Sequence, residues 1–399
     1  MNNAEIVELT HQNLVDVYGC LPIAWSRGHG AYLYDADGNR YLDLFCGLAV
    51  TNLGHGNPRV VRAIKDQAEK LTHVSNVFHT EPTARLAERL AHRFGNGRVF
   101  FGNSGAEANE AAIKLARRWG HNEGGGRYEI IATLGSFHGR TLATLSATGQ
   151  EKYHQGFQPL VPGFPLVAFD DIAALERARN ERSVAVMVEP IQGEGGVVVP
   201  KIDYLKRVRE FCDRNKMLLI LDEIQTGVGR TGKFFAYEHA GLKPDIVTLA
   251  KALGGGIPIG AMIARKEIAA SFTPGSHGTT FGGNPVATAA ANAVLDAIEQ
   301  DGVLENATEV GAYILERLRK FAQGRDRIVE VRGLGMMIGV VLRHDARPIV
   351  DACLRDKLIV NGTAGNVLRL LPPLNLTREE ADAALEIIEN ALTTTTVAK

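Results

Sequence analysis

The chain has 399 residues, of which 45% are hydrophobic, and its 44 basic and 45 acidic residues leave a formal net charge of −1. This length supports a large buried core and predicts at least two domains, while the charge balance argues against nucleic acid or an anionic membrane as the main partner. The four cysteines form no Cys-x-x-Cys pair, which argues against a disulfide scaffold or a structural zinc site and indicates a reducing compartment.

The N-terminal sequence MNNAEIVELTHQ has neither the basic flank nor the apolar core of a secretory signal peptide. No apolar run approaches the length of a membrane-spanning helix. The histidines show no H-E-x-x-H spacing, so no metal site is expected, and His138 is expected to have a packing role or a modest polar contact. We therefore expect a soluble, cytoplasmic protein.

Short β-like runs alternate with helix-like runs along most of the chain. Near the N-terminus, residues 31–35 and 40–45 flank the turn sequence ADGN and predict a β-hairpin. Apolar strands between amphipathic helices indicate a mostly parallel sheet that is covered on both faces. The strands expected in this sheet are residues 98–101, 128–133, 184–190, 217–223 and 245–251.

From about residue 286 the sequence is rich in helix patterns, and strands are expected at 336–342, 358–362 and 367–372 before a final helix. We therefore expect an α/β fold with a large domain over residues 60–285. Residues 1–59 and 286–399 are expected to combine as a smaller α+β domain. In open α/β sheets ligands bind beyond the carboxyl ends of the strands, so the polar residues there carry the most weight.

The stretch FGNSGAEANEAAIKLARRWG at 101–120 joins a strand to a helix expected to end near Trp119. A helix start offers unpaired N–H groups and a partial positive charge, which suit an anion such as a phosphate. Gly102 and Gly105 would let the anion approach the backbone, and Ser104 could add a hydroxyl. The alternative is that Ser104 is a simple helix cap that pairs with Glu107 in a capping box.

A nucleotide-hydrolysing site is the first alternative, because GVGRTGKF at 227–234 nearly matches a Walker A loop. However, Phe234 stands where a hydroxyl residue should reach magnesium. The only candidate Walker B strand, 218–223, lies directly upstream of this loop, and one strand cannot supply both halves of such a site. The sequence therefore disfavours a P-loop NTPase.

Asp222 and Lys251 each follow an apolar strand, so both should lie at the carboxyl edge of the sheet. Taken alone, the acid is a common helix cap and the lysine is usually solvated. Together with an anion cradle, they match pyridoxal phosphate, which needs a lysine for its Schiff base and a carboxylate at its pyridine nitrogen. Phe137 offers an aromatic face for the ring, although ordinary core packing would also explain it.

Six stretches occur in a fixed order along the chain: SGAEANEAAIKLAR, SFHGRT, VEPIQGEGG, LDEIQTGVGRTG, LAKALGGGIPIGA and HGTTFGGNPVA. With these motifs the sequence, over roughly residues 17–388, resembles the class-III (subgroup III) pyridoxal-phosphate aminotransferases. The resemblance implies a transferase of fold type I with pyridoxal 5′-phosphate as its cofactor. A pyridoxal-phosphate protein without catalytic activity would be expected to lack Lys251 or Asp222, and neither is lost.

The resemblance also implies roles for individual residues. Lys251 would form the Schiff base, Asp222 would keep the pyridine nitrogen protonated, and Gln225 would contact the phenolic oxygen of the ring. Thr280 of a neighbouring subunit would reach the phosphate, with Thr279 beside it near the substrate, so the resemblance implies a homodimer with shared active sites. The other cofactor-binding residues that it implies are Ser104, Gly105, Ala106, Phe137, Glu189, Glu223 and Ile224, with Glu189 near the ring through Gln225.

Carboxylate substrates favour arginine anchors, because the guanidinium fork matches a carboxylate. Arg140 follows Phe137, and Arg369 lies inside an apolar strand, where the alternative is a structural salt bridge. By resemblance, Arg369 would bind the α-carboxylate of glutamate, and Glu194 would pair with Arg369 when the other substrate binds. Arg140 would hold the α-carboxylate of an ω-amino substrate, and Tyr18 would line that distal site.

Two anchors of this kind suit two half-reactions. By resemblance, we expect the terminal amine of N2-acetyl-L-ornithine to be transferred to 2-oxoglutarate, giving N-acetyl-L-glutamate 5-semialdehyde and L-glutamate in arginine biosynthesis. Ornithine, succinylornithine, succinyl-diaminopimelate and 4-aminobutyrate remain alternative substrates. The sequence does not distinguish a dimer from a tetramer.

Overall fold

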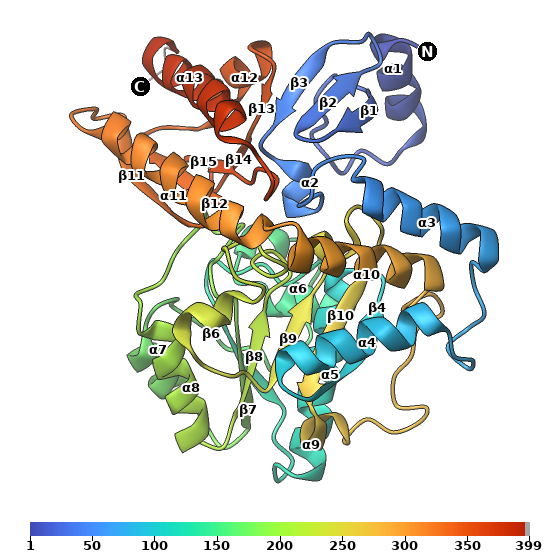
Figure 1. Cartoon of the computed structure of the whole chain (residues 1–399). Helices are drawn as coiled ribbons and strands as arrows, with labels where there is room; N and C mark the ends of the chain where they lie inside the picture. The colour runs from blue at the N-terminus through green and yellow to red at the C-terminus, as the bar shows by residue number, and fades with distance from the viewer. Residues whose placement is uncertain (396–399) are drawn as a thin grey trace.

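The computed structural model describes residues 1–395 of the chain. These residues form two lobes (Figure 1). The middle of the chain builds the lower lobe of Figure 1 around one seven-stranded sheet. The two ends of the chain build the upper lobe around two four-stranded sheets, and both termini lie there (Figure 1).

The large sheet lies at the centre of the lower lobe. Its strands in chain order are β4 (Gly97–Gly102), β5 (Glu129–Thr133), β6 (Leu166–Val167), β7 (Ser183–Val188), β8 (Leu218–Asp222), β9 (Ile246–Leu249) and β10 (Gly260–Arg265). Across the sheet the order is β4-β10-β9-β8-β7-β5-β6. The strands from β9 to β6 pair in parallel, whereas β10 is antiparallel to β9 and to β4. The mostly parallel sheet expected from the sequence is therefore confirmed.

Both faces of this sheet are buried, which explains why its strands are almost continuously apolar. In β8, Leu218 and Ile220 pack into the apolar cluster on one face, while Leu219 and Leu221 pack into the cluster on the other. Side chains alternate across a strand, so a strand covered on both sides must be apolar at every position.

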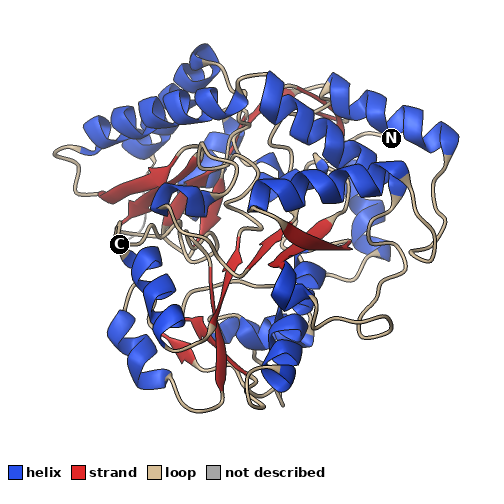
Figure 2. Ribbon diagram, turned by 60° about the horizontal axis from the view of Figure 1, so that its bottom comes forward, coloured by secondary structure: helices blue, strands red, loops and turns tan. Residues whose placement is uncertain are grey.

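Helices cover both faces of the large sheet, as Figure 2 shows in its blue ribbons. On one face α5 packs against β9 and β10, and on the other α8 packs against β7 and β8 with Val208, Phe211 and Cys212 buried. The helices of this part of the chain are α3 (Pro58–Lys70), α4 (Glu81–Phe94), α5 (Gly105–Asn122), α6 (Leu142–Ala147), α7 (Ile172–Ala178), α8 (Tyr204–Arg214), α9 (Lys266–Ala269) and α10 (Pro285–Gln300).

The upper lobe combines both ends of the chain. One sheet has the order β1-β2-β3-β13 and the other has the order β11-β12-β15-β14. Their strands are β1 (Trp25–His29), β2 (Tyr32–Asp35), β3 (Arg40–Asp43), β11 (Ile328–Leu334), β12 (Met337–Leu342), β13 (Leu358–Ile359), β14 (Asn361–Thr363) and β15 (Val367–Leu370). The helices are α1 (Asn3–Asn13), α2 (Cys46–Ala49), α11 (Val303–Ala322), α12 (Arg347–Arg355) and α13 (Arg378–Thr394).

Two strand pairings organise the upper lobe. β13 runs parallel to β3, which joins the N-terminal hairpin to the C-terminal part of the chain. β14 runs antiparallel to β15, and in this pair Asn361 lies directly opposite Arg369. Residues opposite each other on neighbouring strands have side chains within contact distance, so this register determines which residue lies against Arg369.

Most of the expected elements are confirmed, and some details differ. The hairpin of β2 and β3 forms as predicted. The single strand expected over 358–362 is two short strands in different sheets, because the chain leaves β3 after Ile359 and joins β15 at Asn361. Strand β10 was not expected from the sequence, since its glycine and alanine residues have low strand propensity and it forms through pairing on both sides. The domain boundaries at 59/60 and 285/286 stay a prediction.

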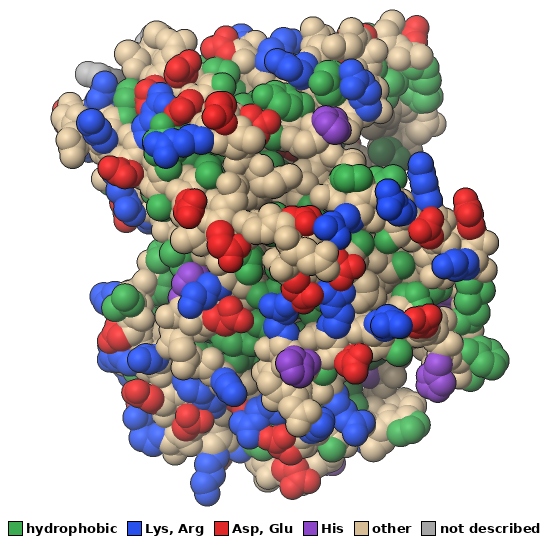
Figure 3. Space-filling model, viewed as in Figure 1, with side chains coloured by type: hydrophobic (Ala, Val, Ile, Leu, Met, Phe, Trp, Pro, Cys, Tyr) green, Lys and Arg blue, Asp and Glu red, His purple; other side chains and the backbone are tan. Residues whose placement is uncertain are grey.

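The outer surface carries charges of both signs. Figure 3 shows Lys and Arg side chains interspersed with Asp and Glu over this face of the molecule, in keeping with the net charge of −1. Within residues 1–395, no helix combines the length and the apolar character needed to cross a bilayer.

The close approach of β10 to the start of α5 gives a test of this packing. A Cβ added at Gly260 would lie 2.1 Å from the carbonyl oxygen of Ser104, so Gly260→Ala must displace β10 or α5. Overpacking of this kind costs about 1–3 kcal/mol, and we expect the free energy of unfolding in urea to fall by that amount. The control is Gly362→Ala, also on a strand, where an added Cβ has no neighbour nearer than 3.6 Å. Equal stability of the two variants would contradict a tight contact between β10 and α5.

Candidate active site

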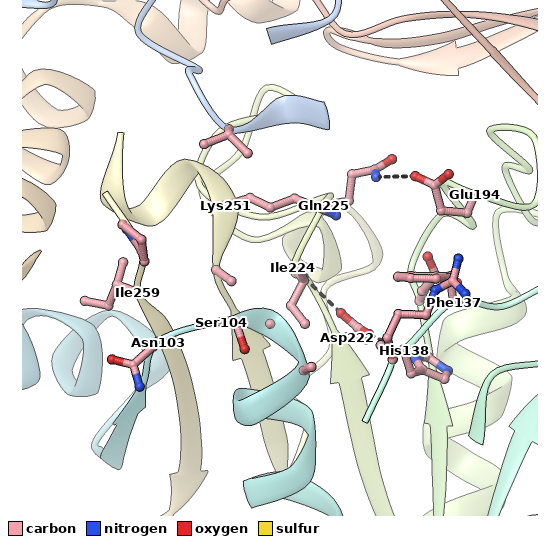
Figure 4. Close-up of a pocket in the computed structure, with 18 of the residues that line it drawn as sticks. Asn103, Ser104, Phe137, His138, Glu194, Asp222, Ile224, Gln225, Lys251 and Ile259 are labelled. Atoms are coloured by element: carbon pink, nitrogen blue, oxygen red, sulfur yellow. Dashed lines mark hydrogen bonds and ion pairs between the residues drawn. The ribbon is translucent and has the colours of Figure 1, made fainter. Parts of the chain in front are cut away.

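A cavity of about 420 Å³ opens at the carboxyl ends of β8 and β9 (Figure 4). It lies where α/β sheets generally bind ligands, and its size suits a small organic molecule. Its wall comes from segments that are far apart in the sequence. The residues predicted from the sequence that line it are Ser104, Gly105, Ala106, Phe137, Arg140, Glu189, Glu194, Asp222, Ile224, Gln225 and Lys251.

One wall of the cavity is the start of α5, which Figure 4 shows with Ser104 at the head of the helix. The Ser104 side chain caps the helix by accepting a hydrogen bond from the Glu107 N–H at 3.2 Å. The Glu107 carboxylate accepts the Asn103 N–H instead of the Ser104 N–H, so the expected capping box is not formed. The N–H groups of Gly105 and Ala106, as the first two helical residues, have no acceptor within the helix. Ser104 is therefore a helix cap beside donors that fit a phosphate.

Asp222 ends β8 and is 3% exposed. Its Oδ2 accepts a hydrogen bond from Nδ2 of Asn109 at 2.7 Å and lies 2.8 Å from Nδ1 of His138. Its Oδ1 accepts the N–H of Ile224 at 3.0 Å. A buried carboxylate is costly unless such donors surround it, and these three fix its orientation at the cavity floor.

His138 is buried beside Asp222, and its environment favours the charged imidazole. Burial lowers the pKa of His138, but the hydrogen bond to Asp222 and the carboxylates of Asp222 and Glu189 outweigh burial and raise it above its ordinary value. Its Nε2 has no hydrogen-bond partner within residues 1–395. Of the two roles expected for His138, packing or a modest polar contact, the structure shows a polar contact, and it is made directly to Asp222.

Lys251 follows β9 by two residues and opens the short 3₁₀ helix η3 (Lys251–Gly254). Its backbone has φ of +46°, a left-handed conformation that costs a non-glycine residue about 1–2 kcal/mol. Burial lowers the pKa of the Lys251 amine, although the carboxylates of Glu194 and Asp222 oppose this shift. Backbone strain and a lowered pKa at one lysine in a cavity are typical of a residue that reacts through its neutral amine.

Arg369 lies behind the cavity wall and is 1% exposed. Its Nη1 is 2.7 Å from Oε1 of Glu194, and Gln225 joins the pair through its Nε2, 3.1 Å from the same oxygen. Figure 4 shows Lys251, Gln225 and Glu194 side by side, with the bond from Gln225 to Glu194 dashed. Burial disfavours ionised Glu194, but the Arg369 guanidinium outweighs burial and lowers the Glu194 pKa.

The loop after β5 supplies the aromatic and cationic side of the cavity. The Arg140 guanidinium lies 3.9 Å from the ring centre of Tyr153 and 5.6 Å from that of Phe137, which are cation–π distances. Glu189 accepts the N–H groups of Phe137 and Gly193, at 3.1 and 3.2 Å. We expected Glu189 to act through Gln225, but Gln225 bonds to Glu194 instead. Burial raises the pKa of Glu189 to about 7, against the opposing effect of His138.

Besides Arg369, four predicted residues lie away from the cavity wall. Glu223 is fully buried and its carboxylate accepts the N–H groups of Ala236 and Tyr237, so its side chain holds the backbone there and does not face the cavity. Tyr18 is 75% exposed in the segment before β1. Thr279 bonds to the side chain of Asn103 at 3.3 Å, and Thr280 lines a separate pocket with Phe281.

Residues that hold the predicted side chains in place by hydrogen bonds were not predicted from the sequence. Asn109 lies on α5 and bonds both to Asp222 and, through its Oδ1, to Thr248 at 2.8 Å. Asn361 bonds to Arg369. Asn109 carried a weak signal, because a polar residue on the buried face of an apolar helix needs a partner. No group of three or more His, Cys, Asp or Glu in residues 1–395 could hold a metal ion.

Comparisons with known proteins agree with this geometry. Residues 16–392 match the protein family described as "Aminotransferase class-III". The chain is 46% identical over 392 residues to an acetylornithine aminotransferase from Methanothermobacter thermautotrophicus, covering 98% of this chain and 99% of the relative. It is 50% identical over 381 residues to an acetylornithine aminotransferase from Caldanaerobacter subterraneus subsp. tengcongensis, covering 95% and 97%.

Solved structures show the same likeness. The fold matches an ornithine aminotransferase from Toxoplasma gondii, which shows partial occupancy of PLP at its active site, with a TM-score of 0.96, 36% identity and coverage of 99% and 95%. It matches an acetylornithine aminotransferase from Elizabethkingia anophelis with a TM-score of 0.88, 33% identity and coverage of 98% and 99%.

The chain belongs to the class-III aminotransferase family. It is therefore an aminotransferase with the fold of type I pyridoxal-phosphate enzymes, and the fold expected from the sequence is confirmed. Membership of this family implies pyridoxal phosphate as the cofactor and amino acids and 2-oxo acids as substrates.

The hydrogen bonds of Asn109 give a test of the site's framework. In Asn109→Leu, the carbonyl of His138, the carboxylate of Asp222 and the hydroxyl of Thr248 all lose a partner. Each buried group left without a partner costs about 1–3 kcal/mol, so we expect the free energy of unfolding to fall by about 2–5 kcal/mol. Thr248→Val removes only one of these bonds and should cost about 1 kcal/mol. Urea denaturation measures both, and a Thr248→Val loss as large as that of Asn109→Leu would contradict the framework.

Proposed function

We propose that this cavity binds pyridoxal 5′-phosphate. The support is the set of groups that line it: a strained lysine, a buried aspartate and the free donors at a helix start. Lys251 would hold the cofactor through its amine, Asp222 would hold a proton at the pyridine nitrogen, and the N–H groups of Gly105 and Ala106 would bind the phosphate. When bound, this cofactor supplies a ring that accepts electrons from the substrate's C–H bond.

Lys251 suits a second task, because burial lowers its pKa and so favours the neutral amine, the form that can accept a proton. Asn109, His138 and the Ile224 N–H hold Asp222 in one orientation, so its charge stays directed into the cavity. The cofactor contacts proposed for Phe137, Glu189, Ile224 and Gln225 rest on their positions in the cavity wall.

We propose that two arginines select the substrates, and the buried Glu194–Arg369 pair is the observation that carries this proposal. Arg369 would bind the α-carboxylate of glutamate when Glu194 moves away, and Glu194 would neutralise Arg369 when a substrate without a carboxylate at that end binds. Arg140 lies on the cavity wall with no acidic partner within 4.0 Å in residues 1–395, so its charge is available for the distal carboxylate of an ω-amino substrate. Tyr18 is proposed to line this distal site.

We propose N2-acetyl-L-ornithine as the amino donor and 2-oxoglutarate as the acceptor, giving N-acetyl-L-glutamate 5-semialdehyde and L-glutamate in arginine biosynthesis. The support is the relatives at 46% and 50% identity that are named acetylornithine aminotransferase. Acylation also removes a positive charge next to Arg140, where the α-ammonium of free ornithine would be repelled.

We propose a cytoplasmic homodimer in which Thr280 of one subunit, with Thr279 beside it, completes the site of the other. Thr280 lies outside the cavity of its own chain, in a separate pocket lined by polar and apolar residues. Val77, Phe78 and Phe281 there are 79%, 68% and 59% exposed, which is typical of a surface that another subunit covers. The location rests on the four unpaired cysteines.

A single-turnover comparison tests the proposed function. With the cofactor loaded, we expect kcat/KM for N2-acetylornithine to exceed that for ornithine, succinylornithine, succinyl-diaminopimelate or 4-aminobutyrate by about tenfold or more, which is about 1.4 kcal/mol in transition-state binding. The change in cofactor absorbance after mixing measures each half-reaction. Lys251→Ala is the control and should react with none of these amines. A faster reaction of ornithine or 4-aminobutyrate would reject the proposed substrate and leave the aminotransferase class in place.

The Glu194–Arg369 pair gives a separate prediction. In Glu194→Ala, Arg369 loses its only acidic partner within 4.0 Å among residues 1–395 and stays available for carboxylates. The ratio of kcat/KM for glutamate to that for the ω-amine should therefore rise by about tenfold. Glu194→Gln is the matched variant, because it keeps the shape and removes the charge, and it should move the ratio in the same direction. An unchanged ratio in both variants would show that this pair does not select substrates.

A further inference from the structure

The side chain of Asn361 holds the Arg369 guanidinium in place through hydrogen bonds. Its Oδ1 accepts two hydrogen bonds from Arg369, from Nε at 3.0 Å and from Nη2 at 2.6 Å. The pairing of β14 with β15 sets this contact, because Asn361 and Arg369 are directly opposite in the antiparallel register. The contact is thus built into the sheet and does not depend on a mobile loop.

These two bonds occupy one edge of the guanidinium and leave the other to the cavity. Nη1 faces Glu194 at 2.7 Å, and Nη2 also reaches the second oxygen of Glu194 at 3.4 Å. A guanidinium can bind a carboxylate in a bidentate manner through either edge. Since Asn361 covers the Nε edge, a carboxylate that replaces Glu194 has only the edge that Glu194 now uses.

The partners of Arg369 are neutral with one exception. Asn361 offers an amide oxygen, Gly193 a backbone carbonyl at 3.1 Å, and Gln225 an amide oxygen at 3.4 Å. Glu194 is the single carboxylate within 4.0 Å of Arg369 in the described part of the chain. The positive charge of Arg369 is therefore neutralised when the Glu194 carboxylate is beside it and is left unpaired when that carboxylate moves away.

The same short strand also holds the backbone that carries Glu194. Thr363 is two residues after Asn361, and its hydroxyl donates to the carbonyl of Glu194 at 2.9 Å. Side chains two residues apart on a strand point to the same side. β14 thus holds both members of the pair, Arg369 by its side chain and Glu194 by its backbone, while the Glu194 carboxylate bonds only to Arg369 and Gln225 among the described residues.

We propose that Asn361 is a positioning residue that orients Arg369 without neutralising it, so that Glu194 alone determines whether the site accepts a substrate carboxylate. This proposal rests on the function proposed above for Arg369. It identifies the amide at position 361 as a specificity determinant, because a carboxylate of the same shape would keep the hydrogen bonds and permanently pair with Arg369.

The test compares Asn361→Asp with Asn361→Ala in the loaded enzyme. In Asn361→Asp we expect kcat/KM for glutamate to fall by about tenfold or more, while the half-reaction with the ω-amine stays within about twofold of the wild type. Calorimetric binding of glutarate, a dicarboxylate without an amine, gives a readout that does not depend on catalysis, and its Kd should rise by a similar factor. Asn361→Ala keeps the site cationic but loosens Arg369, so its loss of glutarate binding should be smaller.

Asn366→Asp is the matched control. It places the same charge change on the same hairpin, but the Asn366 side chain bonds to the carbonyl of Leu342 and not to Arg369. It should bind glutarate as the wild type does. Normal glutamate and glutarate behaviour in Asn361→Asp, with a functional wild type, would overturn the role of Asn361 alone. A wild-type enzyme that neither bound glutarate nor reacted with glutamate would overturn the proposed role of Arg369 together with it.

Discussion

The parallel pairing of β8 with β9 is the constraint on which the site depends. In this pair Asp222 lies opposite Thr248, and Lys251 follows Thr248 by three residues, just beyond the end of β9. The two strands end at the same edge, so an acid and an amine that are 29 positions apart in sequence share one cavity. Asn109 reinforces the arrangement from α5, because it bonds to Asp222 and to Thr248 at once. The helix whose first turn is proposed to bind the phosphate is thereby tied to strands β8 and β9.

The carboxylates of the cavity are expensive to bury, and the structure provides each of them with hydrogen-bond donors or a cation. Asp222 has three donors, Glu189 has two backbone N–H groups, and Glu194 has Arg369. A buried ion pair contributes little net stability, since the loss of hydration offsets most of the attraction. The Glu194–Arg369 pair is therefore poorly explained as a device that stabilises the fold. Its position next to Lys251 and Gln225 is better explained by the need to bind and release a carboxylate.

The residues proposed to act on the cofactor and substrate could be predicted from the sequence more completely than the residues that hold them in place. Asp222 and Lys251 were predictable because each follows an apolar strand, and strand ends in a parallel sheet converge. Asn361 was not, because its contact with Arg369 depends on the register of β14, a strand of three residues inside a run that looked like one longer strand. The resemblance implies a cofactor contact for Glu223, yet successive residues on an extended segment point to opposite sides, and the Glu223 carboxylate accepts the N–H groups of Ala236 and Tyr237. Burial and register are properties of the folded chain, and local patterns do not contain them.

The residues of the site come from both lobes. Lys251, Asp222 and the start of α5 belong to the lower lobe, whereas Arg369 and Asn361 belong to a sheet of the upper lobe (Figure 1). Glu194 follows β7 in the lower lobe and reaches Arg369 in the upper one, so their bond crosses the boundary. If Arg369 binds the substrate carboxylate as proposed, substitutions on β14 and β15 would change which carboxylate is bound without displacing Lys251 or Asp222. One fold can keep one reaction and vary its substrate, and the structures similar to this one include both acetylornithine and ornithine aminotransferases.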